Sequence, residues 1–185
     1  MSRLRIFAES DGNEPTFCSD DHAAIAAQLA GQGVRFERWQ AQGPIAAGDP
    51  PDAVLAAYRS DIARLTAEGG YQSVDVISLS PSNPNKDALR KKFLDEHTHS
   101  EDEVRFFVAG SGLFSLHLAG QVFEVLCEQG DLISVPANTR HWFDMGPEPS
   151  FVAIRLFINP AGWVAQLTGS DIAQRFPRYE SGPAQ

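Results

Sequence analysis

The chain has 185 residues, of which 43% are hydrophobic and 21% are charged, values typical of a globular protein with one sizeable core. Its formal net charge of −9 argues against nucleic acid or an anionic membrane surface as a partner. No apolar run approaches the roughly 20 residues that span a bilayer, and the first residues lack the apolar core of a signal peptide. We therefore predict a cytoplasmic protein in which the distant Cys18 and Cys127 are reduced thiols.

The N-terminal half alternates between predicted strands and helices. Alternating apolar and polar residues predict three strands, over residues 3–8, 34–39 and 71–79. Two helices are predicted between these strands, because acidic or proline residues precede each helix and glycines follow it: residues 19–33 and 49–70. The stretch from Pro81 to Asn85 then breaks the third strand.

The C-terminal half is predicted to be nearly all strand from Lys92 onward. After a hairpin of two short strands, the apolar pattern predicts five more: 112–118, 121–127, 131–135, 141–144 and 151–158. Short strands joined by Gly or Pro turns indicate a sandwich or a small barrel. A last short helix is expected at Gly162-Trp163, and the tail from Arg175 onward is expected to be loose.

The predicted fold class is mainly β with added helices. We find no repeat and no linker that would divide the chain, so residues 1–185 are predicted to form one domain. Residues 1–85 would be an α/β decoration whose helices pack against the outside of a barrel. Residues 86–165 would form the barrel core, and residues 166–185 a tail.

The stretch from Phe93 to Gly110 holds the residues most typical of a metal site. His97 and His99 lie two apart, so on a strand they point to the same face, and Glu103 and Arg105 share that parity. On one straight strand Glu103 would lie ~13 Å beyond His99. One metal ion cannot bridge that distance with ligand bonds of about 2.0–2.2 Å. The chain must therefore turn at residues 100–102, which are polar enough to do so.

A fourth candidate ligand, His141, lies near the end of a second apolar run that Gly130-Asp131 opens. Three imidazoles and one carboxylate suit a divalent transition metal, and they leave positions open for water or substrate. The alternative is that the four residues are unrelated surface or core residues. The spacing HxHxxxE, followed downstream by a further histidine, favours the metal site.

The pattern resembles the metal-binding cupins. In that superfamily the first motif supplies two histidines, a glutamate and a later glycine, which match His97, His99, Glu103 and Gly110. The second motif runs Gly, Pro, Gly, His, Asn. Gly130, Pro136 and His141 match it, whereas Asn138 replaces the middle glycine and Met145 the final asparagine. The resemblance implies a cupin-type double-stranded β-helix, a jelly-roll barrel.

The longer strings EHTHSEDEVRFFVAGSGLFSL and QGDLISVPANTRHWFD resemble the acireductone dioxygenases of the methionine salvage pathway, over residues 78–163. This resemblance implies a monomer that binds Fe2+ or Ni2+ and cleaves acireductone, 1,2-dihydroxy-3-keto-5-methylthiopentene, with O2. With Fe2+ the implied products are 4-methylthio-2-oxobutanoate and formate. With Ni2+ they are 3-methylthiopropionate, formate and carbon monoxide. Alternatives are another cupin dioxygenase, a cupin isomerase, or a non-catalytic cupin that binds metal or a small molecule.

Arg105 is the candidate catalytic residue beside the ligands. A buried guanidinium needs an anionic partner, and the resemblance implies that Arg105 holds an enolate oxygen of the substrate. A structural ion pair with a barrel carboxylate is the alternative. Phe93, Phe143 and Trp163 are predicted to wall an apolar substrate pocket, or else to be core aromatics.

The remaining polar residues of this region are given structural or solvated roles. His117 is expected to be a solvated or hydrogen-bonded strand residue, and His22 to lie at the surface in the first turn of a helix. Glu96, Glu101 and Asp102 are interpreted as solvated, with orientation of a ligand as the alternative for Glu96. The sequence contains no phosphate-binding loop, dinucleotide glycine fingerprint or nucleophile elbow.

Overall fold

The computed structural model describes residues 1–43, 49–159 and 164–180, and it shows a mainly β protein. One antiparallel sheet contains, in spatial order, β11 (Gln166–Leu167), β5 (His97–Thr98), β9 (Arg140–Asp144), β6 (Glu103–Leu118), β7 (Gln121–Glu128), β1 (Arg3–Ala8) and β2 (Phe17–Ser19). The second sheet contains β4 (Ser73–Leu79), β10 (Phe151–Phe157), β6 again, β8 (Asp131–Val135) and β3 (Arg35–Arg38).

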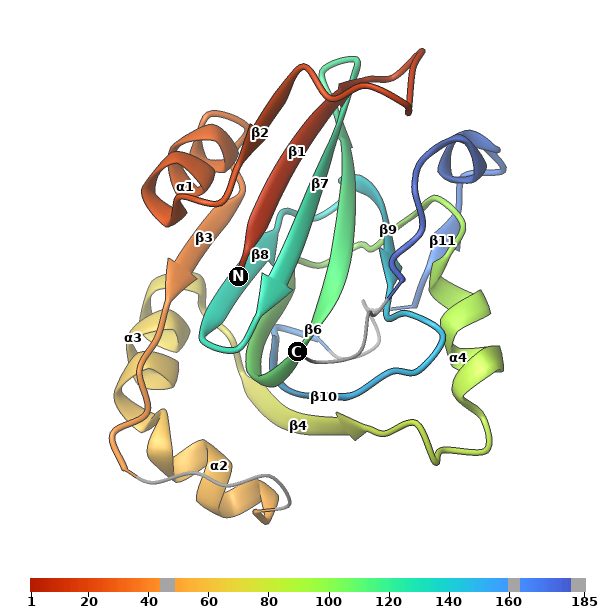
Figure 1. The fold of residues 1–185 in the computed structure, drawn as a ribbon. Coiled ribbons are helices and arrows are strands. Elements are labelled where there is room, and N and C mark those ends of the chain that lie inside the picture. Colours follow the sequence, from red (N-terminus) through yellow and green to blue (C-terminus); the bar gives the residue numbers. More distant parts are fainter. Residues whose placement is uncertain (44–48, 160–163, 181–185) are drawn as a thin grey trace.

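Strand β6 belongs to both sheets, and this joins them into one barrel (Figure 1). Its first half pairs with β8 and β10, and its second half pairs with β7 and β9. The strand bends at Gly110, where φ is +73° and an added Cβ would lie 1.8 Å from the carbonyl oxygen of Ser150. Only glycine fits that position. The architecture confirms the predicted class of a mainly β, cupin-type jelly-roll barrel.

A bulge in β6 changes which side chains face the barrel interior. Phe107 and Ala109 are paired with the consecutive residues Ala153 and Val152, so Val108 is an extra residue in the strand. Because one extra residue inverts the alternation of a strand, odd-numbered residues face inward before the bulge and even-numbered residues after it. This inversion places Arg105, Phe107 and Phe114 in the same interior.

Two hydrophobic layers lie on opposite sides of the second sheet. The interior cluster includes Phe107, Phe114, Leu116, Phe123, Ile133 and Phe143, all at most 2% exposed. The outer cluster joins Val104, Phe106 and Ile154 to residues of α2 (Pro51–Ala57) and α3 (Arg59–Gly69). Burying an aromatic side chain such as Phe106 stabilises the fold by roughly 1.5–3 kcal/mol. These helices therefore cover the outside of the barrel, as predicted.

Helix α1 (His22–Ala30) begins where the sequence predicts. The carboxylate of Asp21 accepts the N–H of Ala24 at 2.8 Å, which satisfies one of the unpaired donors of the first turn. Its buried Ile25 and Leu29 join the interior cluster instead of the outer one.

In the described part of the chain, no helix combines the length and apolar character required to cross a membrane.

Three predictions of secondary structure were wrong. The long helix over residues 49–70 is two helices, because Tyr58 leaves the helical conformation and packs its ring 4.6 Å from that of Phe106. Residues 86–93, assigned in part to strand, form helix α4 (Lys86–Phe93).

The third error concerns the tail, which was expected to be loose from Arg175 onward but packs against the barrel up to Tyr179. Phe176 is buried against Phe7 and Trp142, and the Tyr179 N–H donates to Asp144. The short helix expected at Gly162-Trp163 lies outside the described residues.

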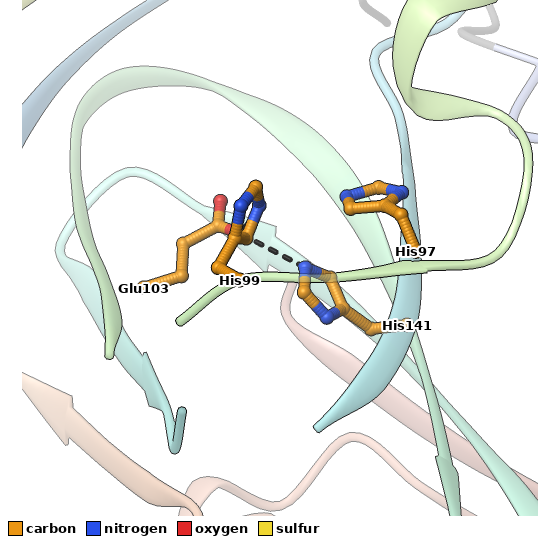
Figure 2. A group of neighbouring side chains, drawn as sticks. All are labelled: His97, His99, Glu103 and His141. Carbon is orange, nitrogen blue, oxygen red and sulfur yellow. Dashed lines mark hydrogen bonds and ion pairs between the residues drawn. The ribbon is translucent and has the colours of Figure 1, made fainter. Parts of the chain in front are cut away.

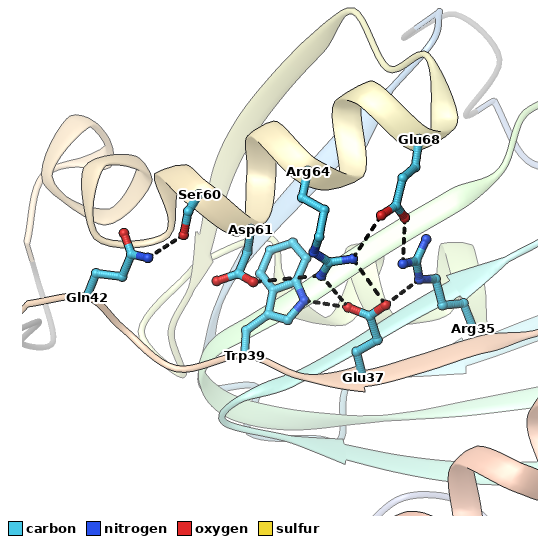
Figure 3. Close-up of polar contacts among 8 residues, drawn as sticks. All are labelled: Arg35, Glu37, Trp39, Gln42, Ser60, Asp61, Arg64 and Glu68. Atoms are coloured by element: carbon cyan, nitrogen blue, oxygen red, sulfur yellow. Dashed lines mark hydrogen bonds and ion pairs between the residues drawn. The ribbon is translucent and has the colours of Figure 1, made fainter.

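An ion-pair network fastens α3 to β3 (Figure 3). Glu37 of β3 accepts hydrogen bonds from Trp39 Nε1 at 2.9 Å, from Arg64 at 2.7 Å and from Arg35 at 2.5 Å. Burial raises the pKa of Glu37, but the bonds from Arg64, Trp39 and Arg35 outweigh it and lower the pKa to about 2. The carboxylate therefore stays charged well below the pH at which an ordinary glutamate takes up a proton.

We expect Glu37→Gln to lower the free energy of unfolding by about 1–2 kcal/mol at neutral pH, since partly exposed charge networks contribute modestly. Because the pKa of Glu37 is depressed in the fold, its stabilisation is complete above pH ~4.5 and decreases as pH falls toward 2. Urea denaturation at several pH values checks this, with exposed Glu14→Gln as the control. An equal effect of both substitutions would contradict the network's role.

Candidate metal centre

Four side chains converge inside the barrel. His97, His99, Glu103 and His141 each offer one ligand atom, and these atoms all lie within 4.8 Å of one another (Figure 2). All four residues are at most 3% exposed. Of the five histidines in the chain, the other two, His22 and His117, lie elsewhere. The group that the sequence analysis singled out is therefore brought together by the fold.

The strand pairing explains how they meet. His97 of β5 and His141 of β9 are direct register partners, so their rings lie side by side with centroids 4.5 Å apart. Glu103 opens β6 after a bend at residues 100–102, as the spacing predicted. However, β5 and β6 are not the two arms of a hairpin, because β9 lies between them in the sheet. The turn instead lies beside the β8–β9 connection, since the N–H of Asn138 donates to the carbonyl oxygen of His99 at 2.8 Å, and it leads to Glu103, which pairs with Val135 of β8.

Two of the imidazoles are oriented by backbone carbonyls. The Nδ1 atoms of His97 and His141 lie 2.8 Å from the carbonyl oxygens of Asp95 and Thr139. A neutral imidazole that donates its Nδ1 proton there presents a bare Nε2 to the interior, which is the tautomer a metal requires. Burial, followed by the neighbouring His141, lowers the pKa of His97 to about 4. His97 is thus neutral at pH 7, as a ligand must be.

Glu103 supplies the negative charge of the cluster. Its Oε2 lies 2.9 Å from Nε2 of His141 and 3.3 Å from Nε2 of His99, while its Oε1 accepts from Arg105 at 2.8 Å. Burial raises the pKa of Glu103, but the charge of Arg105 and the close approach of the His141 and His99 imidazoles hold it well below its usual value. One carboxylate oxygen thus faces the imidazoles, and the other fixes the arginine.

The donor set fits a divalent transition metal. Three imidazole nitrogens and one carboxylate oxygen suit iron, nickel and similar ions, and four donors leave two positions of an octahedron for other ligands. Two of the donors already have their ligating state, neutral for the imidazole of His97 and ionised for the carboxylate of Glu103. The residues present therefore match a mononuclear metal centre.

The two departures from the general cupin motif have simple structural outcomes. Asn138 has φ of +63° and donates its N–H to the carbonyl oxygen of His99 at 2.8 Å. Asn is one of the few residues that adopts this left-handed conformation readily, so it preserves the turn that leads to His141. Met145 is 4% exposed and lines a cavity next to the metal centre.

That cavity has a volume of about 350 Å³. Its wall includes Phe93 of α4, Phe143 of β9 and Arg105, three of the residues predicted to contact a substrate. The guanidinium of Arg105 lies 4.4 Å from the ring centroid of Phe143, an attractive cation–π distance. Gly112 leaves room for this ring, since an added Cβ would lie 2.5 Å from it. Trp163 lies outside the described residues.

Sequence reasoning misread several polar residues near the ligands. Glu96, interpreted as solvated, is 1% exposed, and its carboxylate binds Nδ1 of His117 at 2.6 Å and Oγ1 of Thr168 at 2.6 Å. His117, by contrast, is buried and hydrogen-bonded, which is one of the two alternatives expected for it, with Glu9 on its other nitrogen at 2.9 Å. Asp102 accepts the N–H of Ala137 at 2.9 Å and so ties the loop between His99 and Glu103 to the turn that precedes β9. The partners of Glu96 and Asp102 are distant in sequence, so no local pattern indicates them.

A jelly-roll barrel with three imidazoles and one carboxylate converging inside it defines a metal-binding cupin. Comparison with known proteins places it more narrowly. The model of the ARD/ARD' family matches residues 3–165, most of the chain. The chain belongs to the ARD/ARD' family.

Its similarity to members of this family is high along the whole chain. An acireductone dioxygenase of Stenotrophomonas maltophilia (strain K279a) is 61% identical over 97% of this chain and 97% of its own. One from Klebsiella pneumoniae subsp. pneumoniae is also 61% identical, over 96% of this chain and 99% of its own. A solved acireductone dioxygenase from Bacillus anthracis, with a cadmium ion in its active centre, is 36% identical, covers 90% of this chain and 98% of that one, and has a TM-score of 0.78.

Proposed function

We propose that this protein is a metal-dependent dioxygenase that cleaves acireductone with O2. The observation that carries the proposal is the convergence of His97, His99, Glu103 and His141 beside a cavity lined by Arg105. Relatives that are about 60% identical over nearly the whole chain are acireductone dioxygenases. A homologue with a metal ion in its active centre further supports a metal at this site.

Fe2+ or Ni2+ is the metal we propose, one ion per chain, held by the three imidazoles and by Oε2 of Glu103. When bound, the metal supplies a Lewis acid and a template for the substrate. Two adjacent oxygens of an ene-diol match the two positions that four protein ligands leave open. Cadmium in the Bacillus anthracis homologue is likewise divalent.

Arg105 is proposed to hold a negatively charged oxygen of the substrate. It is 6% exposed and lines the cavity, and one of its terminal nitrogens donates to Glu103. Its Nε is buried without a hydrogen-bond partner among the described residues. A buried unpaired donor is costly, and an enolate oxygen would satisfy it with a charge-assisted hydrogen bond.

The apolar wall of the cavity is proposed to receive the methylthio end of the substrate. Phe93, Phe143 and Met145 lie on this wall together with Leu89 and Phe151. Thioether sulfur makes favourable contacts with aromatic rings and with other polarisable groups. Trp163 remains a prediction from the sequence as a further member of this wall.

The metal would determine the products, and the reaction would belong to methionine salvage. We expect the iron-loaded protein to form 4-methylthio-2-oxobutanoate and formate. The nickel-loaded protein should form 3-methylthiopropionate, formate and carbon monoxide. Oxygen uptake with freshly generated acireductone, followed by product analysis for each metal form, checks both statements.

The same experiment separates this proposal from its rivals. Protein that demonstrably holds its metal but does not exceed the spontaneous rate of oxygen uptake would refute acireductone as the substrate. Uptake with a different ene-diol would indicate another cupin dioxygenase. Metal and ligand binding without any turnover would indicate a binding cupin.

A further inference from the structure

The cavity beside the metal centre carries a charge opposite to that of the whole chain. The protein has 24 acidic and 15 basic residues, and a formal net charge of −9. The described wall of this cavity nevertheless contains three cations, Lys92, Arg105 and Arg155, and no carboxylate. Arg105 has its partner in Glu103, whereas Lys92 and Arg155 have no part in the metal cluster. They raise the question of what anion the cavity receives.

Arg155 is built firmly into the wall. It lies on β10 directly between Arg105 of β6 and Asp75 of β4 in the strand register. Asp75 accepts Nε of Arg155 at 2.9 Å and a terminal nitrogen at 2.7 Å, which is the rigid two-bond fork typical of arginine and carboxylate. The guanidinium also lies 5.1 Å from the ring centroid of Phe157. Asp75 is outside the cavity wall, so the pair presents its positive end to the cavity.

Lys92 stands where the cavity reaches solvent. It belongs to the last turn of α4, it is exposed, and its amine lies 5.3 Å from the ring centroid of Phe93, another wall residue. None of the described carboxylates forms an ion pair with it. The positive charge of Lys92 at the cavity entrance is therefore not neutralised by a neighbouring carboxylate.

The chemistry of the proposed substrate explains a positive entrance. A hydroxyl conjugated through a C=C bond to a ketone is a vinylogous carboxylic acid, so the ene-diol readily loses a proton and becomes an anion. A chain of net charge −9 repels such an anion unless the local field at the entrance is reversed. Resting on the proposed function, we propose that Lys92 and Arg155 form a cationic entrance that recruits the anionic substrate to Arg105.

The entrance should govern capture of the substrate more than its conversion. For metal-loaded protein acting on acireductone, we expect Lys92→Gln and Arg155→Gln each to lower kcat/KM several-fold, and the double variant about 10-fold. Most of the loss should lie in KM. Wild-type kcat/KM should fall as salt rises toward physiological strength, where the Debye length is about 8 Å. The double variant should show a much weaker dependence on salt.

Two matched variants separate charge from structure. Lys91→Gln makes the same change on the adjacent exposed residue of α4, outside the cavity wall, and should leave kcat/KM and its salt dependence unchanged. Asp75→Asn breaks the same ion pair as Arg155→Gln but leaves the cation in place. It should not lower kcat/KM. A fall in Asp75→Asn equal to that in Arg155→Gln would show that only the ion pair matters and would overturn the role of Arg155 as a recruiting cation.

The outcome also separates this inference from the function on which it rests. If the wild type turns over acireductone while Lys92→Gln and Lys91→Gln behave alike and salt has no effect, the cationic entrance is refuted and the dioxygenase stands. If the wild type with its metal in place shows no turnover above the spontaneous rate, the dioxygenase itself is refuted, and the entrance with it.

Discussion

Replacing His99 by alanine is expected to remove both the bound metal and the turnover of acireductone. The variant keeps only two imidazoles and one carboxylate, and water must take the vacated position. The metal affinity should fall by more than the roughly 10–100-fold that loss of an outer-shell partner causes. Metal content after dialysis, measured by elemental analysis, together with oxygen uptake, checks this result.

The matched control for this experiment is His22→Ala, a histidine remote from the metal cluster whose ring stacks on that of Phe36. This variant should keep its full metal content and its turnover. Full metal content in His99→Ala would mean that His99 is not a ligand. Loss of metal from His22→Ala would instead indicate that histidine loss acts through general unfolding.

The second large effect is expected at Arg105. Arg105→Ala should retain the metal, because the three imidazoles and Oε2 of Glu103 remain. Turnover should fall by about 10²–10³-fold, the usual consequence of removing one preorganised donor to a developing or resident negative charge. Arg105→Lys keeps the charge but not the planar fork, so it should recover only part of the activity.

Metal content decides between the two roles of Arg105. Its hydrogen bond to Oε1 of Glu103, at 2.8 Å, shows that it also helps to orient a candidate ligand. A variant that loses turnover and metal together would assign Arg105 to that orienting role alone. Retained metal with lost turnover would assign it to the substrate.

The barrel and the candidate ligands could be predicted because their signals are local. The apolar runs of β7 and β8 are a property of short windows, and so is the HxHxxxE spacing. The required turn at residues 100–102 followed from a distance argument alone. The change in which residues of β6 face the interior is also visible in the sequence. The inward-facing Phe114 and Leu116 are even-numbered, whereas Glu103 and Arg105 are odd-numbered.

The errors concern features that depend on distant partners. Helix α4 has the polar sequence KDALRKKF and no fully buried residue, and its wall residues Leu89 and Phe93 gain their role only from the cavity they cover. Glu96 is buried because of His117 and Thr168, the second of which is 72 residues away. The tail up to Tyr179 is held by Asp144. Local propensity cannot indicate such contacts, since tertiary structure overrides it.

The position of β1 between β2 and β7 has a consequence for synthesis on the ribosome. Ala8 pairs with Gln121 and Arg3 with Leu126, so the first strand to emerge must wait until more than half of the chain has followed. Until then, of the elements that contact β1 in the finished fold, Leu4 and Ile6 can pack only against the short β2 and helix α1. Contacts so far apart in sequence make folding slow, and nascent chains with such unpaired strands are exposed to aggregation. Strand β1 is therefore left without its β7 partner for most of translation.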